Sequence, residues 1–253
     1  MKLLKVDNLT KRFGGLVAVN GLDFYIDRGE ILGLIGPNGA GKTTVFNMIT
    51  GAFAPSDGEI VFEGTRITGF KPNRIARLGA VRTFQLTNVF HEMTVLENVI
   101  LGTHHNSGIG FFQFLHSKSH IRKKDTDALE KATKVIDFLD LTDQIDTLAN
   151  NLPHGQQRRL EMAIALAVEP KLLLLDEPLQ GMNQDEVRDM LSRIQKIRST
   201  GATILLVEHN MKAVTNVCDR VVVLDFGRKL DEGAPTEVMK NPAVIEAYLG
   251  IQA

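Results

Sequence analysis

The 253-residue chain is long enough for one large domain or two small ones with a sizeable core. Its 29 basic and 30 acidic side chains leave a formal charge of −1, so the composition gives no bulk attraction to nucleic acid. The single cysteine, Cys218, excludes a disulfide within the chain and fits a reducing compartment. No apolar stretch approaches the ~18–20 residues of a membrane-spanning helix, and the charged N-terminus lacks the apolar core of a signal peptide. We therefore expect a cytoplasmic protein that reaches a membrane only through a partner.

The first 30 residues have the pattern of a β-sheet. Apolar residues predict strands over 3–6 and 17–26, with turns at 14–15 and 20–21. Phe13 stands beside the first of these turns. Its ring is either a half-buried strand residue or a platform on which adenine stacks, and the residue by itself favours the former.

The next segment combines a strand, a glycine-rich loop and a helix. Ile31–Ile35 is a short apolar run typical of a buried strand, and residues 44–49 predict a helix that ends at Gly51. The sequence between them matches the phosphate loop G-x-x-x-x-G-K-[ST] at every fixed position. Backbone N–H groups of such a loop point at one polyanion, the lysine reaches the β- and γ-phosphates, and the hydroxyl ligates Mg²⁺. The residues expected to bind a nucleoside triphosphate are Gly36, Pro37, Asn38, Gly39, Ala40, Gly41, Lys42, Thr43 and Thr44.

The middle of the chain changes from strands to helices. A strand is predicted over 59–62, a short helix over 73–78, and a strand over 80–84 that ends in Gln85. Gln85 could ligate Mg²⁺ or position water, whereas an isolated glutamine is usually a solvated loop residue. Helical spacing follows over 94–101 and 120–139.

The second half contains two further candidate sites. Pro153 suits the first turn of a helix that ends before Pro170, and the N–H groups of Gly155 and Gln156 near its start could bind an anion. A continuous apolar strand at 172–175 then ends in Asp176 and Glu177. We expect Asp176 to anchor Mg²⁺ opposite the phosphate loop and Glu177 to accept a proton from an attacking water. The alternative is that the two carboxylates only cap a loop.

The last elements repeat the alternation of helix and strand. A helix is predicted over 185–197, and a strand over 203–207 ends in Glu208, His209 and Asn210. Strands at 220–224 and 229–231 precede a tail at 235–249 that suits two short helices. A single histidine such as His209 is more often a loop residue than a catalyst.

Taken in this order, the motifs resemble those of the ATP-binding-cassette (ABC) ATPases over essentially the whole chain. The matches are the phosphate loop, Gln85, LPHGQQRR at 152–159, LLLLDEP at 172–178, and His209. The resemblance implies an α/β P-loop NTPase fold formed by a single cassette domain, 1–253. In it, a core lobe with a mixed β-sheet (about 1–89 and 166–253) holds an inserted α-helical subdomain (about 90–165).

The resemblance also assigns roles within an ATP- and Mg²⁺-dependent site. It implies that Phe13 stacks on adenine, that Gln85 links Mg²⁺ to the helical lobe, and that His209 contacts the γ-phosphate. Catalysis then falls to Glu177, His209 and Lys42, and metal binding to Thr43, Gln85 and Asp176. Family members form head-to-tail dimers in which a signature segment caps the partner's ATP, here Leu152, Pro153, His154, Gly155 and Gln156.

Longer segments narrow the resemblance to ATP-binding subunits of branched-chain (hydrophobic) amino acid importers. These segments are GLVAVNGLDFYIDRGEILGLIGPNGAGKTT, MTVLENVILG, GQQRRLEMA, LLVEHNM and the ending EAYLG. The subfamily implies a second ATPase subunit, two membrane permease subunits on whose inner face the chain sits, and an extracytoplasmic solute-binding protein. Importers for urea, amides or aromatic acids share these motifs, so the cargo stays open. The groove near Phe90 and Met93 is the expected dock for the membrane partner.

The sequence departs from the usual cassette pattern at three positions. Pro153 replaces the serine and His154 the first glycine of the L-S-G-G-Q signature, and Asn183 stands where many cassettes have aspartate. Pro153 offers neither a hydroxyl nor an N–H to the partner's γ-phosphate. This suggests a functionally unequal heterodimer rather than a homodimer. The alternative functions are a soluble cassette ATPase acting on nucleic acid or ribosomes, a phosphate-loop kinase, and a structural ATP-binding subunit.

Overall fold

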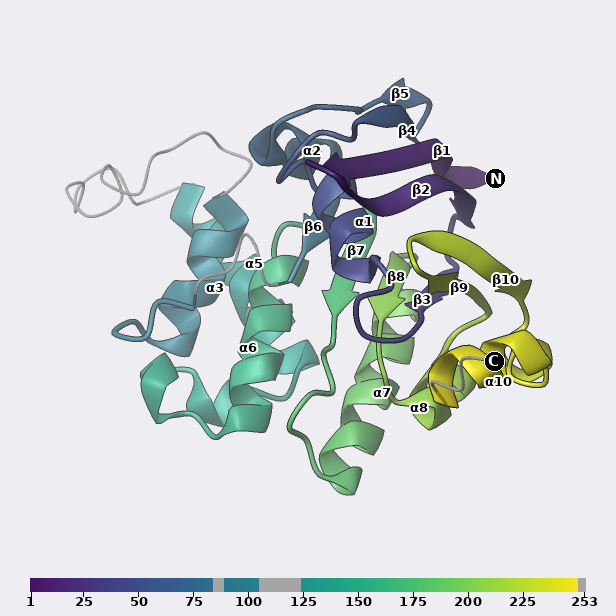
Figure 1. Ribbon diagram of the computed structural model, residues 1–253. Helices are drawn as coiled ribbons and strands as arrows, with labels where there is room; N and C mark the ends of the chain where they lie inside the picture. Colours follow the sequence, from purple (N-terminus) through teal and green to yellow (C-terminus); the bar gives the residue numbers. More distant parts are fainter. Residues whose placement is uncertain (84–88, 105–123, 250–253) are drawn as a thin grey trace. The chain divides into compact units, whose positions relative to one another are not determined.

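The chain forms two compact units in the computed structural model, which describes residues 1–83, 89–104 and 124–249 (Figure 1). The larger unit contains Met1–Ala80 and Lys171–Ala253, and the helical unit contains Val81–Pro170. The insertion was expected at about 90–165. The helical unit begins earlier and ends later than that range. Gln85 and residues 250–253 lie outside the described residues.

The larger unit begins with a four-stranded antiparallel sheet, ordered β2-β1-β4-β5. Its strands are β1 (Lys2–Phe13), β2 (Leu16–Asp27), β4 (Asp57–Phe62) and β5 (Thr65–Arg66). β1 extends well beyond the strand predicted over 3–6, because the solvent-facing end of an antiparallel pair can be polar and gives no apolar signal. β2 matches the strand predicted over 17–26 to within one residue at each end, and it continues through residues 20–21, where a turn was predicted.

A second sheet holds the strands that carry the predicted site, in the order β10-β9-β3-β8-β7-β6. β7, β8, β3 and β9 are parallel, and β10 pairs antiparallel with β9, which makes the sheet mixed, as expected. The strands are β3 (Ile31–Ile35), β6 (Ala80–Arg82), β7 (Leu172–Asp176), β8 (Thr203–Val207), β9 (Arg220–Asp225) and β10 (Arg228–Gly233). The chain passes between its two units at β6.

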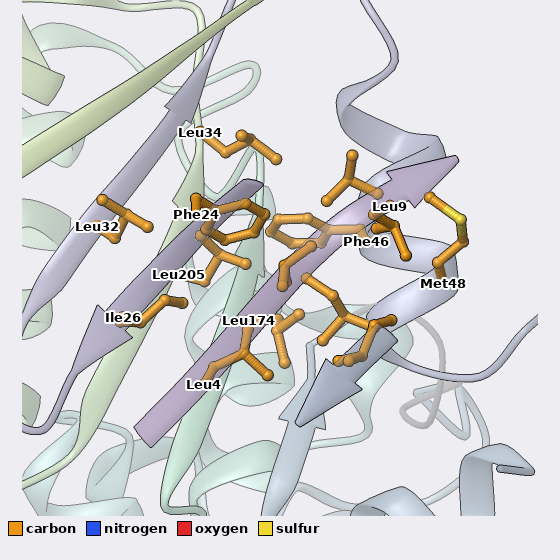
Figure 2. Packing of buried hydrophobic residues seen from close by; sticks show 14 of the residues in the cluster. Leu4, Leu9, Phe24, Ile26, Leu32, Leu34, Phe46, Met48, Leu174 and Leu205 are labelled. Atoms are coloured by element: carbon orange, nitrogen blue, oxygen red, sulfur yellow. The ribbon is translucent and has the colours of Figure 1, made fainter. Parts of the chain in front are cut away.

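Helix α1 (Lys42–Ile49) lies between the two sheets (Figure 1). Figure 2 shows Phe46 of α1 among side chains of both sheets, with Phe24 of β2, Leu34 of β3 and Leu174 of β7. Alternate residues of the parallel strands face this cluster, and the intervening ones are also buried. Helices cover the face of the sheet that points away from this cluster. This explains why the strands are apolar on both sides. The remaining helices of this unit are α2 (Pro72–Leu78), α7 (Gln184–Ser199), α8 (Met211–Val217), α9 (Pro235–Val238) and α10 (Pro242–Leu249).

The helical unit contains α3 (Val95–His104), α5 (Lys124–Phe138) and α6 (His154–Leu166), and two short 3₁₀ turns, Thr142–Gln144 and Ala149–Asn151, lie between α5 and α6. A small apolar core holds the helices together, made of Val95, Val99, Ala132, Ile136, Leu160 and Ala163. Within the described part of the chain, no helix combines the length and the apolar character needed to cross a bilayer.

Candidate nucleotide site

The phosphate loop connects β3 to α1, and two of its glycines are required by the backbone. Gly36 has φ +146°, and a Cβ built on it would lie 2.1 Å from the carbonyl oxygen of Leu224. Gly41, the N-cap of α1, has φ +105°, and its Cβ would lie 2.7 Å from the carbonyl oxygen of Ala18. Only glycine accepts such conformations and contacts without strain. The loop therefore keeps its shape because neighbouring backbone fills the space that side chains would need.

Lys42 is held inside this loop. Its Nζ donates to the carbonyl oxygens of Gly36 at 2.7 Å and Pro37 at 2.8 Å, and the side chain is buried. Burial lowers the pKa of Lys42 below its ordinary value, while the negative charges of Glu177 and Asp176 act against this decrease. An ammonium group in this position can exchange its carbonyl partners for phosphate oxygens.

A pocket of about 450 Å³ opens beside the loop. It brings together residues that lie far apart in the sequence. The carboxyl ends of β7 and β8 lie at the same edge of the sheet as the phosphate loop, so the residues that follow these two strands reach the pocket. Its lining consists of Phe13, Leu16, Val17, Ala18, Asn38, Gly39, Gly41, Lys42, Thr43, Thr44, Glu177, His209 and Phe226. Gly36, Pro37 and Ala40 shape the loop without lining the pocket. A cavity of this size suits a drug-sized ligand such as a nucleotide.

Two aromatic residues stand at the pocket, and the sequence indicated only one of them. Phe13 is 46% exposed, and its ring packs edge-to-face on Phe53 with the centroids 5.4 Å apart. Phe226 is 74% exposed and occupies the β9–β10 turn with φ +42°. The next residue, Gly227, donates its N–H to the carbonyl oxygen of Ala40 at 3.0 Å, so this turn is fixed to the phosphate loop. The signal that could have indicated Phe226 in the sequence was an aromatic residue before a glycine in a tight turn.

Glu177 and His209 meet in the pocket although 32 residues separate them. Oε1 of Glu177 lies 2.6 Å from Nε2 of His209, and both side chains are partly exposed. Glu177 has the left-handed φ of +48°, and its N–H donates to the carbonyl oxygen of Val207 at 2.9 Å. The strain of that conformation is offset by the hydrogen bond to β8. A carboxylate and an imidazole beside a phosphate-binding loop form an acid–base pair suited to activating water.

The residues proposed for Mg²⁺ supply the oxygen ligands that this ion prefers. The exposed Thr43 hydroxyl belongs to the pocket lining, and Asp176 is the last residue of β7, close enough to Lys42 to influence its pKa. No cluster of three or more histidine, cysteine or acidic side chains able to hold a metal exists among the described residues.

The signature segment lies in the helical unit at the start of α6. Pro153 is the N-cap rather than a residue of the first turn, and its carbonyl oxygen accepts the N–H of Gln156 at 2.9 Å. Leu152 is buried, and its carbonyl oxygen accepts a bond from the Gln157 side chain at 3.0 Å. His154 and Gly155 are the first residues of the helix, where N–H groups lack partners within the helix. Of the two N–H groups expected to bind an anion, that of Gly155 fits this description, whereas that of Gln156 already donates to the carbonyl oxygen of Pro153.

Asn183 has a clear structural role. Its side chain caps α7 by accepting the N–H groups of Asp185 at 2.9 Å and Glu186 at 3.0 Å, and its own N–H donates to Glu186. Aspartate and asparagine cap helices about equally well. The departure at this position therefore preserves the start of the helix.

Comparison with known proteins decides the family. The sequence profile described as ABC transporter matches residues 19–180, and that of the branched-chain amino acid ATP-binding cassette transporter matches 229–253. The high-affinity branched-chain amino acid transport ATP-binding proteins BraF of Pseudomonas aeruginosa and LivG of Escherichia coli are each 42% identical over 249 residues. In both cases the match covers 98% of this chain and 98% of the relative. The chain belongs to the ABC transporter family.

Solved ABC cassettes confirm the fold. The ADP conformation of an ATP-binding cassette of an ABC transporter superposes with a TM-score of 0.88 at 32% identity, covering 99% of both chains. A nucleotide-free cassette gives a TM-score of 0.85 at 33% identity, covering 98% of both. The predicted α/β ABC ATPase cassette is therefore correct, and the chain is a nucleotide-binding ATPase of this family.

Proposed function

We propose that this ABC cassette hydrolyses ATP with Mg²⁺ to power an importer of branched-chain amino acids or a related small solute. The observation that carries the ATPase reaction is the pocket in which Glu177 and His209 lie beside Lys42. The cargo rests on the relatives, whose names describe branched-chain amino acid transport.

Each residue of the site has a distinct role in the proposed reaction. Phe13 stacks on adenine beside Phe226, and the loop N–H groups bind the phosphates together with Lys42. Thr43, Asp176 and Gln85 are proposed to hold Mg²⁺, which when bound reduces the charge on the β- and γ-phosphates. Glu177 takes a proton from water as the water oxygen bonds to the γ-phosphorus and the bond to the ADP oxygen breaks. Lys42 stabilises the charge on the transferred group.

The pairing of Glu177 with His209 is compatible with this role. A carboxylate accepts hydrogen bonds at two oxygens, so the bond at Oε1 leaves Oε2 to receive the proton of the water. Nε2 of His209 can then turn to a γ-phosphate oxygen when ATP is present. Exchange between these two partners would let His209 register the departure of phosphate.

The proposed partners are a second cassette subunit, two membrane permeases and, through them, an extracytoplasmic solute-binding protein, with the chain on the inner face of the membrane. In the helical unit, Phe90 is 43% exposed near Met93. The buried Asn98 fixes this segment, because its Oδ1 accepts the N–H of Phe90 at 2.8 Å and its Nδ2 donates to the carbonyl oxygen of Thr94 at 2.9 Å. A rigid segment with an exposed aromatic suits a permease contact.

Lys42→Ala tests the nucleotide site. We expect ATP binding by the purified chain to weaken by roughly tenfold or more, because the buried ammonium that would bind the phosphates is lost. Isothermal titration calorimetry measures the affinity, and Lys196→Ala, an exposed lysine on α7, is the control. Equal ATP affinity in Lys42→Ala and wild type would contradict the proposed site.

Pro153→Ser tests whether the signature limits the partner's site. A serine N-cap adds a hydroxyl for the γ-phosphate of the partner's ATP, a bond to a charged group worth ~1.5–3 kcal/mol. We expect ATP turnover by the assembled complex to rise severalfold. Pro153→Ala, which removes the ring without adding a hydroxyl, is the matched control. An unchanged rate in Pro153→Ser would mean that proline costs nothing at this position.

A further inference from the structure

Glu208 is a buried carboxylate beside the proposed catalytic pair. It directly follows the last residue of β8 and precedes His209 in the chain. Its exposed fraction is 4%, and it is absent from the pocket lining. Burial of a carboxylate is unfavourable unless other groups pair with it, so a buried carboxylate that does not line the pocket calls for a structural explanation.

Backbone N–H groups from two loops donate to this side chain. The N–H of Leu179 donates to Oε1 at 2.8 Å, and the N–H of His209 donates to Oε2 at 3.1 Å. Leu179 lies two residues after Glu177, in the loop that follows β7. The Glu208 side chain therefore joins the loop that carries Glu177 to the loop that carries His209.

A second connection runs between the same loops. The N–H of Glu177 donates to the carbonyl oxygen of Val207, the residue before Glu208. With two connections in place, the loops cannot slide past each other without breaking a buried hydrogen bond. Both connections involve residues at or next to Glu177 and His209, whose side chains lie 2.6 Å apart.

The carboxylate is retained at an electrostatic cost. Burial raises the pKa of Glu208 above its ordinary value, and the negative charge of Glu177 adds to the increase, while the backbone N–H groups of Leu179, His209 and Asn210 act against it. A neutral side chain would avoid both unfavourable effects, but it would offer fewer acceptor oxygens to these N–H groups.

We propose that Glu208 is a positioning residue for ATP hydrolysis, which holds the backbones of Leu179 and His209 so that Glu177 and His209 keep their separation. The inference rests on the proposed ATPase reaction. Glu208 makes no contact with ATP in this scheme. Its loss should therefore slow the chemical step and leave nucleotide binding unchanged.

The test compares two substitutions in the full chain. Glu208→Leu removes both acceptor oxygens, and we expect kcat for ATP hydrolysis to fall by roughly tenfold while the Kd for ATP stays within about twofold of wild type. Glu208→Gln keeps one acceptor oxygen and should lose only about threefold in kcat. In a Glu177→Gln background, Glu208→Leu should cause no further loss, because the group that it positions is already disabled.

Other outcomes separate this inference from the proposed function. Glu246→Leu, an exposed position on α10, is the control for replacing a glutamate by leucine. Wild-type kcat in a folded Glu208→Leu, an equal loss in ATP affinity, or a full additional loss in the Glu177→Gln background would overturn the inference. If Glu208→Leu fails to fold, wild-type kcat in Glu208→Gln would overturn it. Absence of hydrolysis by the wild-type protein would instead refute the proposed function.

Discussion

Glu177→Gln is expected to bind ATP with wild-type affinity and to hydrolyse it at least ~100-fold more slowly. Glutamine has nearly the same shape as glutamate, and its side-chain oxygen can still accept a bond from Nε2 of His209. It cannot accept the proton of the attacking water. Single-turnover hydrolysis and equilibrium binding, measured on the same preparation, separate the two effects.

The design needs a control for the loss of one negative charge. Glu237→Gln serves this purpose, because Glu237 is exposed and its carboxylate forms a surface ion pair with the neighbouring Lys240. We expect it to keep wild-type turnover. Turnover retained in Glu177→Gln would remove Glu177 from its role as general base. Loss of ATP binding in that variant would instead assign Glu177 to substrate binding.

The parts of the fold that are dictated locally could be predicted from the sequence. Ile31–Ile35 and Thr203–Val207 match the predicted strands residue for residue. Both strands are fully buried, and all of their residues except Gly33 and Thr203 are apolar, which gives a clear strand signal. The phosphate loop is likewise a contiguous motif whose glycines meet a local steric need, and the structure gives Gly36 and Gly41 positive φ values.

The composition of the site beyond that loop depends on strand order. β7 pairs with β8, and Asp176 is aligned with Val207, so the residues after both strands come together. The residues that flank Glu177 and His209 in the sequence do not indicate that these two side chains come together. The family resemblance placed them in one site because it supplied the topology. Phe226 and Glu208 were missed because a single residue at the end of a strand produces no periodic pattern.

The short helices α2, α9 and α10 agree with the helices predicted over 73–78 and in the tail, but one other short helix was missed. Helix α8, Met211–Val217, was not predicted, although Asn210 begins it and accepts the N–H of Ala213 at 3.1 Å. An asparagine N-cap was therefore present as a signal. Seven residues are too few to show helical periodicity clearly, and burial against the sheet rather than propensity stabilises such a helix.

Gly36→Ala is expected to abolish measurable ATP binding and to destabilise the larger unit by roughly 2–5 kcal/mol. The left-handed backbone at φ +146° is strained for alanine, and the added Cβ would meet the carbonyl oxygen of Leu224 at 2.1 Å. Relief of that clash requires movement of the loop or of β9. Because Lys42 donates to the carbonyl oxygen of Gly36, the same movement would displace the ammonium from the site.

Gly29→Ala is the matched control for backbone strain without a clash. Gly29 has φ +74°, and its Cβ would meet no atom within 4 Å. We expect a loss of only ~1–2 kcal/mol in unfolding free energy and unchanged ATP affinity. Chemical denaturation and calorimetric titration of both variants test the comparison. Wild-type ATP affinity in Gly36→Ala would show that the loop backbone can move while the phosphates still bind. Lys42, rather than the fixed shape of the loop, would then be the main source of nucleotide binding.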